Sequence, residues 1–170
     1  MTTALAGALL RPARTADVAA IRRLIDLYAP DRRLLSKATV TLYEDVQEFV
    51  VAEVNGTPVG CGALHVMWQD LAEIRTLAVD PAFLGQGIGR QLLRSLIARG
   101  NGLGVARIFC LTFEADFFAK FGFEHLTGPA VSADVFAELL RSEDEGVAEF
   151  LDLERVKPNT LGNDRMILRI

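Results

Sequence analysis

The sequence has few cysteines, no long apolar run and no excess of basic residues. Its 170 residues include only two cysteines, so a disulfide-built scaffold is excluded. The apolar runs are far shorter than the ~20 residues that a membrane-spanning helix requires. Lys and Arg total 18 against 22 Asp and Glu, a net charge of −4, which argues against a nucleic-acid-binding protein with its basic stripe. The apolar share of 51% excludes a disordered chain and predicts one domain over residues 1–170.

The two cysteines and the chain start indicate the compartment. Cys61 and Cys110 lie in apolar, strand-like segments without a second ligand at CxxC or HxxxH spacing. We therefore expect no metal, and we interpret both as small buried residues in a reducing cytoplasm. The short apolar stretch before Leu9 has no positive charge ahead of it, and Arg11 and Arg14 follow it, which is the wrong order for a secretory signal.

Hydrophobic periodicity predicts helices and strands that interleave around one sheet. The expected helices are 15–28, about 41–46, 90–99, 116–120 and 132–140, and the expected strands are 49–54, 59–64, 73–79, 105–112 and 165–169. Asn55-Gly56 predicts a hairpin turn, and Gly100 is expected to end its helix. Residues 143–145 are acidic and are expected to form a solvated turn. The fold class is therefore α/β, of the α+β type, with a mixed antiparallel and parallel twisted sheet flanked by helices.

The most informative segment is Gly85-Gln86-Gly87-Ile88-Gly89, which lies between a predicted strand and a predicted helix. Glycines at alternate positions remove side chains from one side of the loop. Backbone N–H groups can then converge on an anion at the helix N-terminus. Arg90 and Arg94 add guanidinium groups near the same end. The pattern predicts a phosphate or pyrophosphate site.

Two known phosphate loops fit this segment poorly. A P-loop requires Lys followed by Ser or Thr after its last glycine, whereas Arg90-Gln91 follows here. A dinucleotide-binding fingerprint requires GxGxxG, and Arg90 or Leu92 occupies the position of its third glycine. A glycine turn without a ligand is the remaining alternative. The strand before the loop and the basic helix after it favour a ligand.

Two segments together resemble the GCN5-related N-acetyltransferase (GNAT) family. Residues 77–90, from Leu77-Ala78-Val79-Asp80-Pro81 through the glycine loop, are similar to the family's cofactor signature, Arg/Gln-x-x-Gly-x-Gly/Ala. Residues 118–123 are similar to its second signature, Tyr-x-x-x-Gly-Phe. The resemblance implies the GNAT fold and acetyl-CoA as cosubstrate. Leu84 departs from the usual Arg or Gln, and Phe118 replaces the Tyr that usually protonates the leaving thiolate.

The details are similar to the acetyltransferase domain of N-acetylglutamate synthases. This branch acetylates the α-amine of glutamate in arginine biosynthesis, and many members carry an amino-acid-kinase domain that this chain is too short to hold. The resemblance implies a cytoplasmic enzyme, an amino-acid N-acetyltransferase without arginine feedback through such a domain. The family also suggests a homodimer. The expected partners are a small amino acid and acetyl-CoA, with neither nucleic acid nor membrane.

The resemblance also assigns residue roles. Glu73 is expected to be the general base, and its alternative is a strand-end carboxylate in solvent. Thr112 is expected to be the general acid, and its alternative is an ordinary strand residue, with His65 as a third choice. The expected cofactor contacts are Leu77, Ala78, Val79, Gly85, Gln86, Gly87, Ile88, Gly89 and Arg90, with Phe117 and Phe118 beside the thioester and adenine.

The acceptor's carboxylate needs a cation. Lys37 stands where the branch has a carboxylate-binding Arg, so the acceptor could be glutamine or another α-amino acid instead of glutamate. Arg75 and Leu35 complete the expected acceptor site, and Lys157 is a weaker candidate. Two rival functions stay open. One is acetyl transfer to another amine, such as a protein N-terminus, a lysine or an antibiotic. The other is a non-catalytic acyl-CoA sensor.

Overall fold

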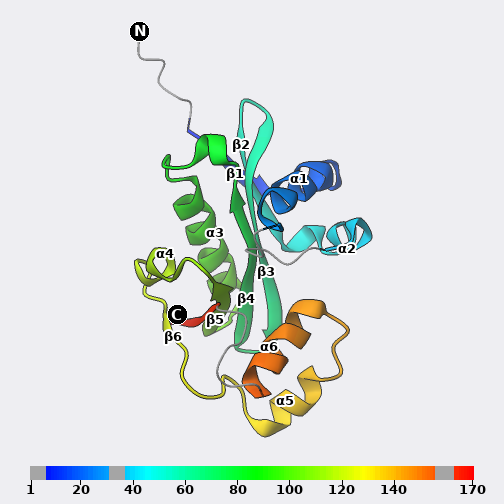
Figure 1. The fold of residues 1–170 in the computed structure, drawn as a ribbon, viewed down its shortest axis with the longest axis vertical. Coiled ribbons are helices and arrows are strands. Elements are labelled where there is room, and N and C mark those ends of the chain that lie inside the picture. The colour runs from blue at the N-terminus through cyan, green and yellow to red at the C-terminus, as the bar shows by residue number, and fades with distance from the viewer. Residues whose placement is uncertain (1–6, 31–36, 156–162) are drawn as a thin grey trace. The chain divides into compact units, whose positions relative to one another are not determined.

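Helices are interspersed among the strands in the computed structural model, which describes residues 7–30, 37–155 and 163–170 (Figure 1). Within these residues, seven strands pair in the order β1-β2-β3-β4-β5-β7-β6. The strands are β1 (Leu9–Pro12), β2 (Phe49–Val54), β3 (Thr57–Trp68), β4 (Leu71–Val79), β5 (Arg107–Thr112), β6 (Glu124–His125) and β7 (Asp164–Arg169). The helices are α1 (Val18–Tyr28), α2 (Thr39–Glu44), α3 (Ile88–Leu103), α4 (Ala115–Ala119), α5 (Ala133–Leu139) and α6 (Glu145–Arg155). β4 and β5 are parallel, whereas β1–β2, β2–β3, β5–β7 and β6–β7 are antiparallel, so the predicted mixed sheet is confirmed.

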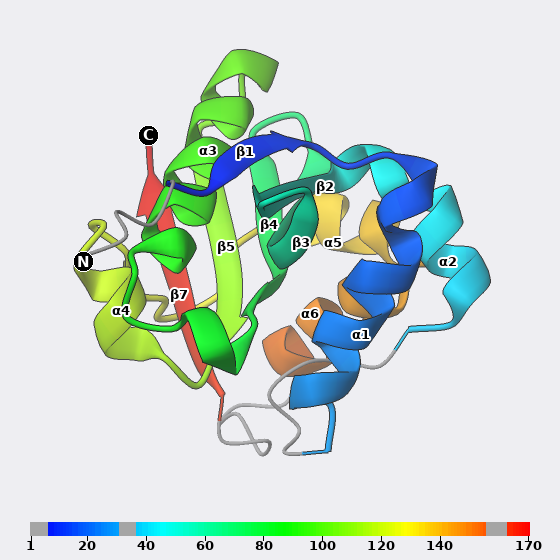
Figure 2. The same ribbon diagram turned by 90° about the horizontal axis from the view of Figure 1, so that it is seen from above.

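The chain forms two compact units, and the first comprises Met1–His65 and Ile74–Leu103. The face of α1 that carries Val18, Ile21, Leu24 and Ile25 is fully buried, because these apolar residues recur at helical spacing. They pack with residues of α2, β2, β3 and β4 in one hydrophobic cluster. In both ribbon views, strands β2–β4 lie between α3 and the pair α1–α2 (Figures 1 and 2).

Strand β3 alternates glycine with small apolar residues because helix α3 packs closely against it. Cys61 and Ala63 belong to the cluster shared with α1. A Cβ on Gly60 would lie 3.0 Å from Leu92 Cδ1, and one on Gly62 would lie 2.8 Å from a leucine Cδ1 of the same helix. Any larger residue at these positions would displace α3, the helix that follows the glycine loop.

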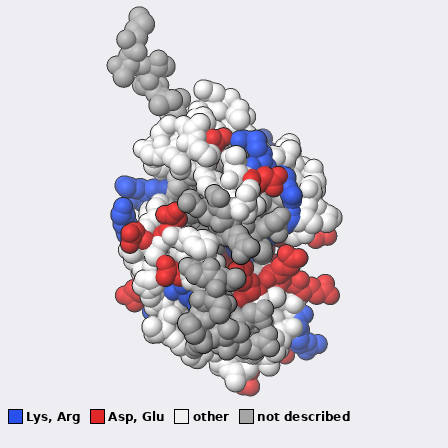
Figure 3. Space-filling view, viewed as in Figure 1, with Lys and Arg blue, Asp and Glu red and all other residues white. Residues whose placement is uncertain are grey.

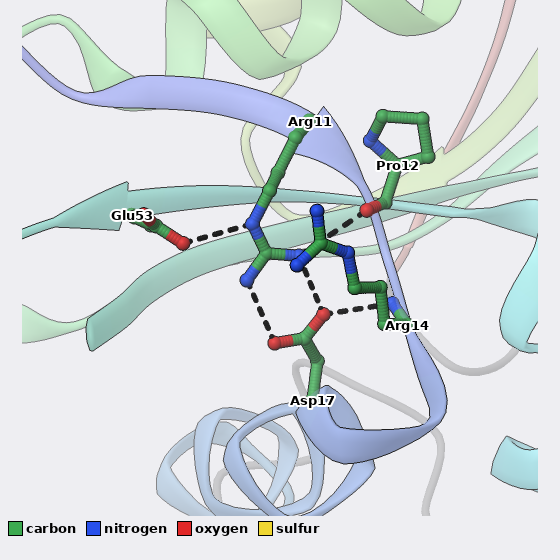
Figure 4. Close-up of polar contacts among 5 residues, drawn as sticks. All are labelled: Arg11, Pro12, Arg14, Asp17 and Glu53. Carbon is green, nitrogen blue, oxygen red and sulfur yellow. Dashed lines mark hydrogen bonds and ion pairs between the residues drawn. The ribbon is translucent and has the colours of Figure 1, made fainter. Parts of the chain in front are cut away.

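An ionic network joins the first strand to its neighbours (Figure 4). Arg11 on β1 donates two hydrogen bonds to Asp17, at 2.7 and 2.9 Å, and one to Glu53 on β2 at 2.8 Å. Asp17 also accepts the backbone N–H of Arg14 at 2.7 Å. Arg11 and this backbone N–H hold the pKa of the buried Asp17 below its ordinary value. Asp17 thereby ties the 3-10 turn Thr15–Asp17 to the end of β1, and α1 begins directly after this turn at Val18.

The second unit comprises Val66–Glu73 and Gly104–Ile170. Its apolar cluster joins β3, β4 and β5 to α5 and α6, and Phe109 meets Phe150 edge-on with ring centroids 4.9 Å apart. The parallel pair aligns Leu71 with Arg107 and Glu73 with Phe109. Ser132 caps α5 by accepting the N–H of Val135 at 3.4 Å, as the sequence predicts.

Two element boundaries predicted from sequence are wrong. Helix α3 continues through the buried Gly100 to Leu103, and it is Gly104, with φ +86°, that follows its end. Residues 143–145 are exposed or half-buried, as the predicted solvated turn requires, but Glu145 already begins helix α6, because Asp144 Oδ1 accepts the N–H of Val147 at 2.9 Å. Val147 and Phe150 then recur at helical spacing and are buried.

The surface agrees with the composition. Acidic and basic side chains both appear on the face drawn in Figure 3, and among the coloured residues no continuous basic band crosses it. In the part of the chain that the structure describes, every helix is too short or too polar to cross a membrane.

Candidate functional site

The glycine loop has the open backbone that an anion requires. Gly85 and Gly87 both have φ of +78°, and a Cβ built on either would meet nothing within 4 Å. Helix α3 begins at Ile88, two residues earlier than predicted, and the carbonyl of Gly87 accepts the N–H of Gln91 at 3.1 Å. The first N–H groups of a helix have no partner within it. The loop and the helix start therefore offer backbone donors beside open space, as a diphosphate requires.

The two predicted arginines are also on this helix. Arg90 and Arg94 are exposed on α3, near its N-terminus. They add positive charge to the first two turns of α3. Of the predicted cofactor residues 85–90, residues 85–87 and Arg90 are exposed, Gly89 is half-buried, and the side chain of Ile88 is buried.

Strand β4 enters this loop through a backbone irregularity that the sequence does not signal. Thr76 has φ +55°, a left-handed conformation that is uncommon for a β-branched residue. The carbonyl of Thr76 accepts a hydrogen bond from the Cys61 thiol at 3.5 Å, and the same sulfur accepts a hydrogen bond from the N–H of Ala78. Tyr28 Oη donates to the carbonyl of Val79. Side chains from β3 and α1 therefore fix the backbone where the family resemblance places the thioester arm.

The end of β4 is fixed as well. Asp80 Oδ2 lies 2.8 Å from Arg23 Nη1, and Asp80 Oδ1 accepts the N–H of Ala82 at 3.0 Å. Arg23 and this N–H together lower the pKa of Asp80. The N–H of Asp80 donates to the carbonyl of Val59 at 2.8 Å. The first residue after β4 is thus held by α1 and β3, and the loop starts from a fixed point.

In the second unit, the candidate base is buried. Glu73 is 5% exposed within β4, so the alternative of a solvent-exposed strand-end carboxylate is wrong. Burial raises the pKa of the Cys110 thiol, and the nearby negative charge of Glu73 raises it further. A buried carboxylate is costly to maintain without a structural or chemical role.

The candidate acid ends the neighbouring strand. Thr112 is 8% exposed, and its Oγ1 accepts the N–H of Glu114 at 2.8 Å. Because the hydroxyl oxygen is the acceptor in this bond, the hydroxyl proton takes no part in it. The side chain is oriented by its own turn and keeps the capacity to donate.

The aromatic pair on α4 divides into two roles. Phe118 is 5% exposed and packs edge-on against Phe117 and Phe123, with centroids 5.3 and 5.2 Å apart. Phe117 is half-buried and also contacts Phe121 at 5.4 Å. Phe118 therefore serves the packing of its own unit, and Phe117 has the more accessible ring.

The candidate acceptor residues have their own partners in the first unit. Lys37 is 8% exposed, and its Nζ lies 3.5 Å from Asp45 Oδ2. Arg75 is 8% exposed within β4. His65 Nδ1 lies 2.7 Å from Glu48 Oε1, so this third titratable candidate already has a carboxylate partner. Leu35 and Lys157 lie outside the described residues.

A strand that contains a left-handed residue, carries a buried carboxylate and runs into an open glycine loop is the arrangement that the family resemblance implies for an acyl-CoA-dependent acyltransferase. Among the described residues, no group of three or more His, Cys, Asp or Glu could hold a metal ion. The model of the Acetyltransferase (GNAT) family matches residues 18–123, and the chain belongs to this family. The resemblance predicted from the two signatures is thereby confirmed.

Known relatives agree with this membership. The chain is 57% identical over 162 residues to an amino-acid acetyltransferase of Mycobacterium tuberculosis, covering 94% of this chain and 92% of the relative. It also resembles the crystal structure of Rv2747 from that organism in complex with CoA and NLQ, with a TM-score of 0.89 at 56% identity, covering 95% of this chain and 99% of that one.

Longer relatives contain a matching part. The N-acetylglutamate synthase of Neisseria gonorrhoeae, complexed with coenzyme A and N-acetyl-glutamate, superposes with a TM-score of 0.76 at 25% identity, and the match covers 96% of this chain but 35% of that one. The amino-acid acetyltransferase of Ralstonia nicotianae is 35% identical over 120 residues, which are 69% of this chain and 27% of the relative. This chain thus matches about a quarter to a third of the longer enzymes.

Proposed function

We propose that this acetyl-CoA-dependent enzyme acetylates the α-amino group of L-glutamate or L-glutamine, in the N-acetylglutamate step of arginine biosynthesis. The observation that carries the proposal is the burial of Glu73 on the strand that leads into the open glycine loop. The 57% identity to an amino-acid acetyltransferase over nearly the whole chain supports an amino-acid acceptor.

Acetyl transfer to an amine makes three demands on the protein. Acetyl-CoA supplies the thioester, and its diphosphate fits the N–H groups of residues 85–90. Glu73 removes a proton from the α-ammonium group, directly or through water, so that nitrogen can attack the thioester carbon. Backbone N–H groups of Leu77 and Val79 stabilise the developing oxyanion, while the N–H of Ala78 between them binds Cys61. Thr112 donates a proton to the departing thiolate of CoA.

The acceptor's carboxylates require cations, and Lys37 and Arg75 supply them in this proposal. Lys37 is a point charge that Asp45 already compensates in part. A neutral side-chain amide makes a smaller demand on such a lysine than a second carboxylate does. We therefore include glutamine with glutamate as the acceptor.

The decisive experiment measures thiol release from acetyl-CoA with each free amino acid as acceptor. We expect turnover with glutamate or glutamine and little with lysine, a peptide N-terminus or an aminoglycoside. Turnover confined to those other amines would refute the acceptor class. Tight CoA binding without release from any acceptor would indicate a sensor.

Glu73→Gln tests the base, because it keeps the size of the side chain and removes its charge. We expect kcat to fall about 10²- to 10⁴-fold with a smaller change in the KM for acetyl-CoA. Glu124→Gln is the matched control, since Glu124 is exposed on β6. Full activity of Glu73→Gln at every pH would remove Glu73 from the mechanism.

Thr112→Val should also lower kcat, and a loss of no more than a small factor would exclude Thr112 as the acid.

Three further properties belong to this proposal: one catalytic domain over residues 1–170, a homodimer and a cytoplasmic location. Light scattering coupled to gel filtration tests the dimer. Growth of an arginine-requiring strain that lacks its own N-acetylglutamate synthase tests the pathway, because the chain should restore growth without arginine and its Glu73→Gln variant should not.

A further inference from the structure

The second unit contains a cavity that shares no residue with the candidate site. It has a volume of about 380 Å³ and lies at the turn between β3 and β4, with walls that include Trp68, Asp70, Arg107, Val131 and Val135. Ligand sites usually measure ~300–1,000 Å³ and combine an apolar wall with a few polar groups. The volume of this open cavity falls within that range, and its wall combines Trp68 and two valines with one charged pair.

Its polar wall presents opposite charges side by side. Asp70 Oδ2 lies 3.1 Å from Arg107 Nη2, and the two side chains are 48% and 25% exposed. Arg107 Nη1 also donates to the carbonyl of Ala130 at 2.5 Å, which fixes the plane of the guanidinium group. In these contacts Asp70 uses one carboxylate oxygen, and a guanidinium group has five N–H donors. Both groups can therefore bind a ligand while they remain paired.

Its apolar wall is formed by Trp68, Val131 and Val135. Trp68 is 38% exposed, and both valines are half-buried. An indole face attracts aliphatic, planar and cationic groups alike. The cavity thus places a surface for a side chain next to one positive and one negative group.

We propose that this cavity binds a free α-amino acid other than the acceptor being acetylated. The ligand's α-carboxylate pairs with Arg107, its α-ammonium group pairs with Asp70, and its side chain packs on Trp68 and the valines. A zwitterion suits this site because each of its charges meets the opposite one and the net charge of the pair does not change. A simple anion or cation would satisfy one of the two groups and repel the other.

The cavity adjoins the pair of strands, β4 and β5, that carries the proposed base. The carbonyl of Asp70 accepts the N–H groups of Ala106 and Arg107, at 3.1 and 2.9 Å. From there, β4 and β5 pair in register as far as Glu73 and Phe109. A ligand held by Asp70 and Arg107 therefore contacts the start of the strand pair that carries the proposed base, and we expect it to change the rate of acetyl transfer.

Intrinsic fluorescence tests binding without requiring catalysis, since Trp68 is the single tryptophan of the chain. Each L-amino acid is titrated, together with its N-acetyl derivative and its decarboxylated amine. We expect a saturable change with at least one amino acid, and an affinity at least tenfold weaker for the two derivatives, each of which lacks one charge. The absence of a saturable response to any amino acid would overturn the proposal, as would equal binding of the derivatives.

Two variants separate this cavity from the acceptor site. Asp70→Asn should weaken the fluorescence response at least tenfold and leave kcat and KM for the acceptor within about twofold. Lys37→Gln should raise the acceptor's KM and keep the response. Loss of the response in Lys37→Gln, or its retention in Asp70→Asn, would assign it to the acceptor site and refute the cavity. Binding that leaves the acetylation rate unchanged would refute the regulatory effect. Failure of the proposed acetyl transfer would leave the titration unaffected.

Discussion

Replacing Cys61 with alanine tests whether a buried thiol holds the irregular backbone of β4. At neutral pH the group is a thiol, because burial raises its pKa to about 12. It can therefore donate to the carbonyl of Thr76 while accepting the N–H of Ala78. Alanine removes both contacts from a position with 0% exposure.

The expected loss follows from these contacts. A buried backbone group left without its partner costs about 1–3 kcal/mol, and sulfur bonds lie at the low end of that range. Truncating the buried side chain adds about 1 kcal/mol. We expect Cys61→Ala to lower the free energy of unfolding by about 2–4 kcal/mol. Because the freed backbone is the segment that the proposed function places against the thioester arm, we expect the KM for acetyl-CoA to rise about tenfold.

Urea unfolding and steady-state kinetics measure the two effects separately. Val51→Ala is the matched control, because Val51 pairs with Cys61 in the same core cluster and truncation there also removes buried volume. It should lose stability without a rise in KM. Cys61→Ser keeps a donor and an acceptor and should recover part of the KM. The reasoning is refuted if Cys61→Ala leaves KM unchanged, or if Val51→Ala raises KM equally.

Four other substitutions test features of the two units. Gly87→Ala and Gly104→Ala should each cost about 1–2 kcal/mol in thermal unfolding, because both glycines have positive φ and open space around them and alanine is strained in that conformation. Only Gly87→Ala should raise the KM for acetyl-CoA. An equal rise in both variants would contradict the role of the loop. Asp17→Asn removes a carboxylate whose pKa Arg11 lowers in the folded state, so its stabilisation is present above the unfolded pKa of ~4 and is lost as pH falls through the native pKa. The variant should be about 1–3 kcal/mol less stable at pH 7 and should converge with the parent in denaturant titrations once the pH falls below the native pKa. A difference that persists undiminished in acid would exclude this mechanism. Gly62→Ala places a Cβ 2.8 Å from a leucine of α3 and should cost about 1–3 kcal/mol of unfolding free energy, whereas an unchanged value would mean that the helix yields freely.

The sequence predicted those parts of the fold, such as turns and helix caps, whose conformation depends on residues adjacent in the chain. Asn55 and Gly56 form the hairpin turn with φ of +49° and +78°, because these residue types tolerate positive φ. Ser132 caps its helix for a similar local reason. The open backbone of the glycine loop was predictable too, since glycines at alternate positions allow the positive φ that Gly85 and Gly87 adopt.

Other features depend on distant parts of the chain. Thr76 has no sequence signal for a left-handed conformation, because Cys61, 15 residues away, satisfies the backbone groups beside it. The burial of Glu73 depends on strand pairing and not on its immediate neighbours. Helix α6 was missed because Asp144 resembles a surface charge until its bond to Val147 shows it to be a helix cap.

The burial of both native cysteines has a practical consequence for spectroscopy. Cys61 and Cys110 are enclosed, and desolvation raises the pKa of each thiol, so little reactive thiolate exists at neutral pH. A maleimide dye or spin label should therefore attach selectively to one cysteine introduced on the surface. Distance measurements in solution can then begin from the natural sequence, without first constructing a cysteine-free background.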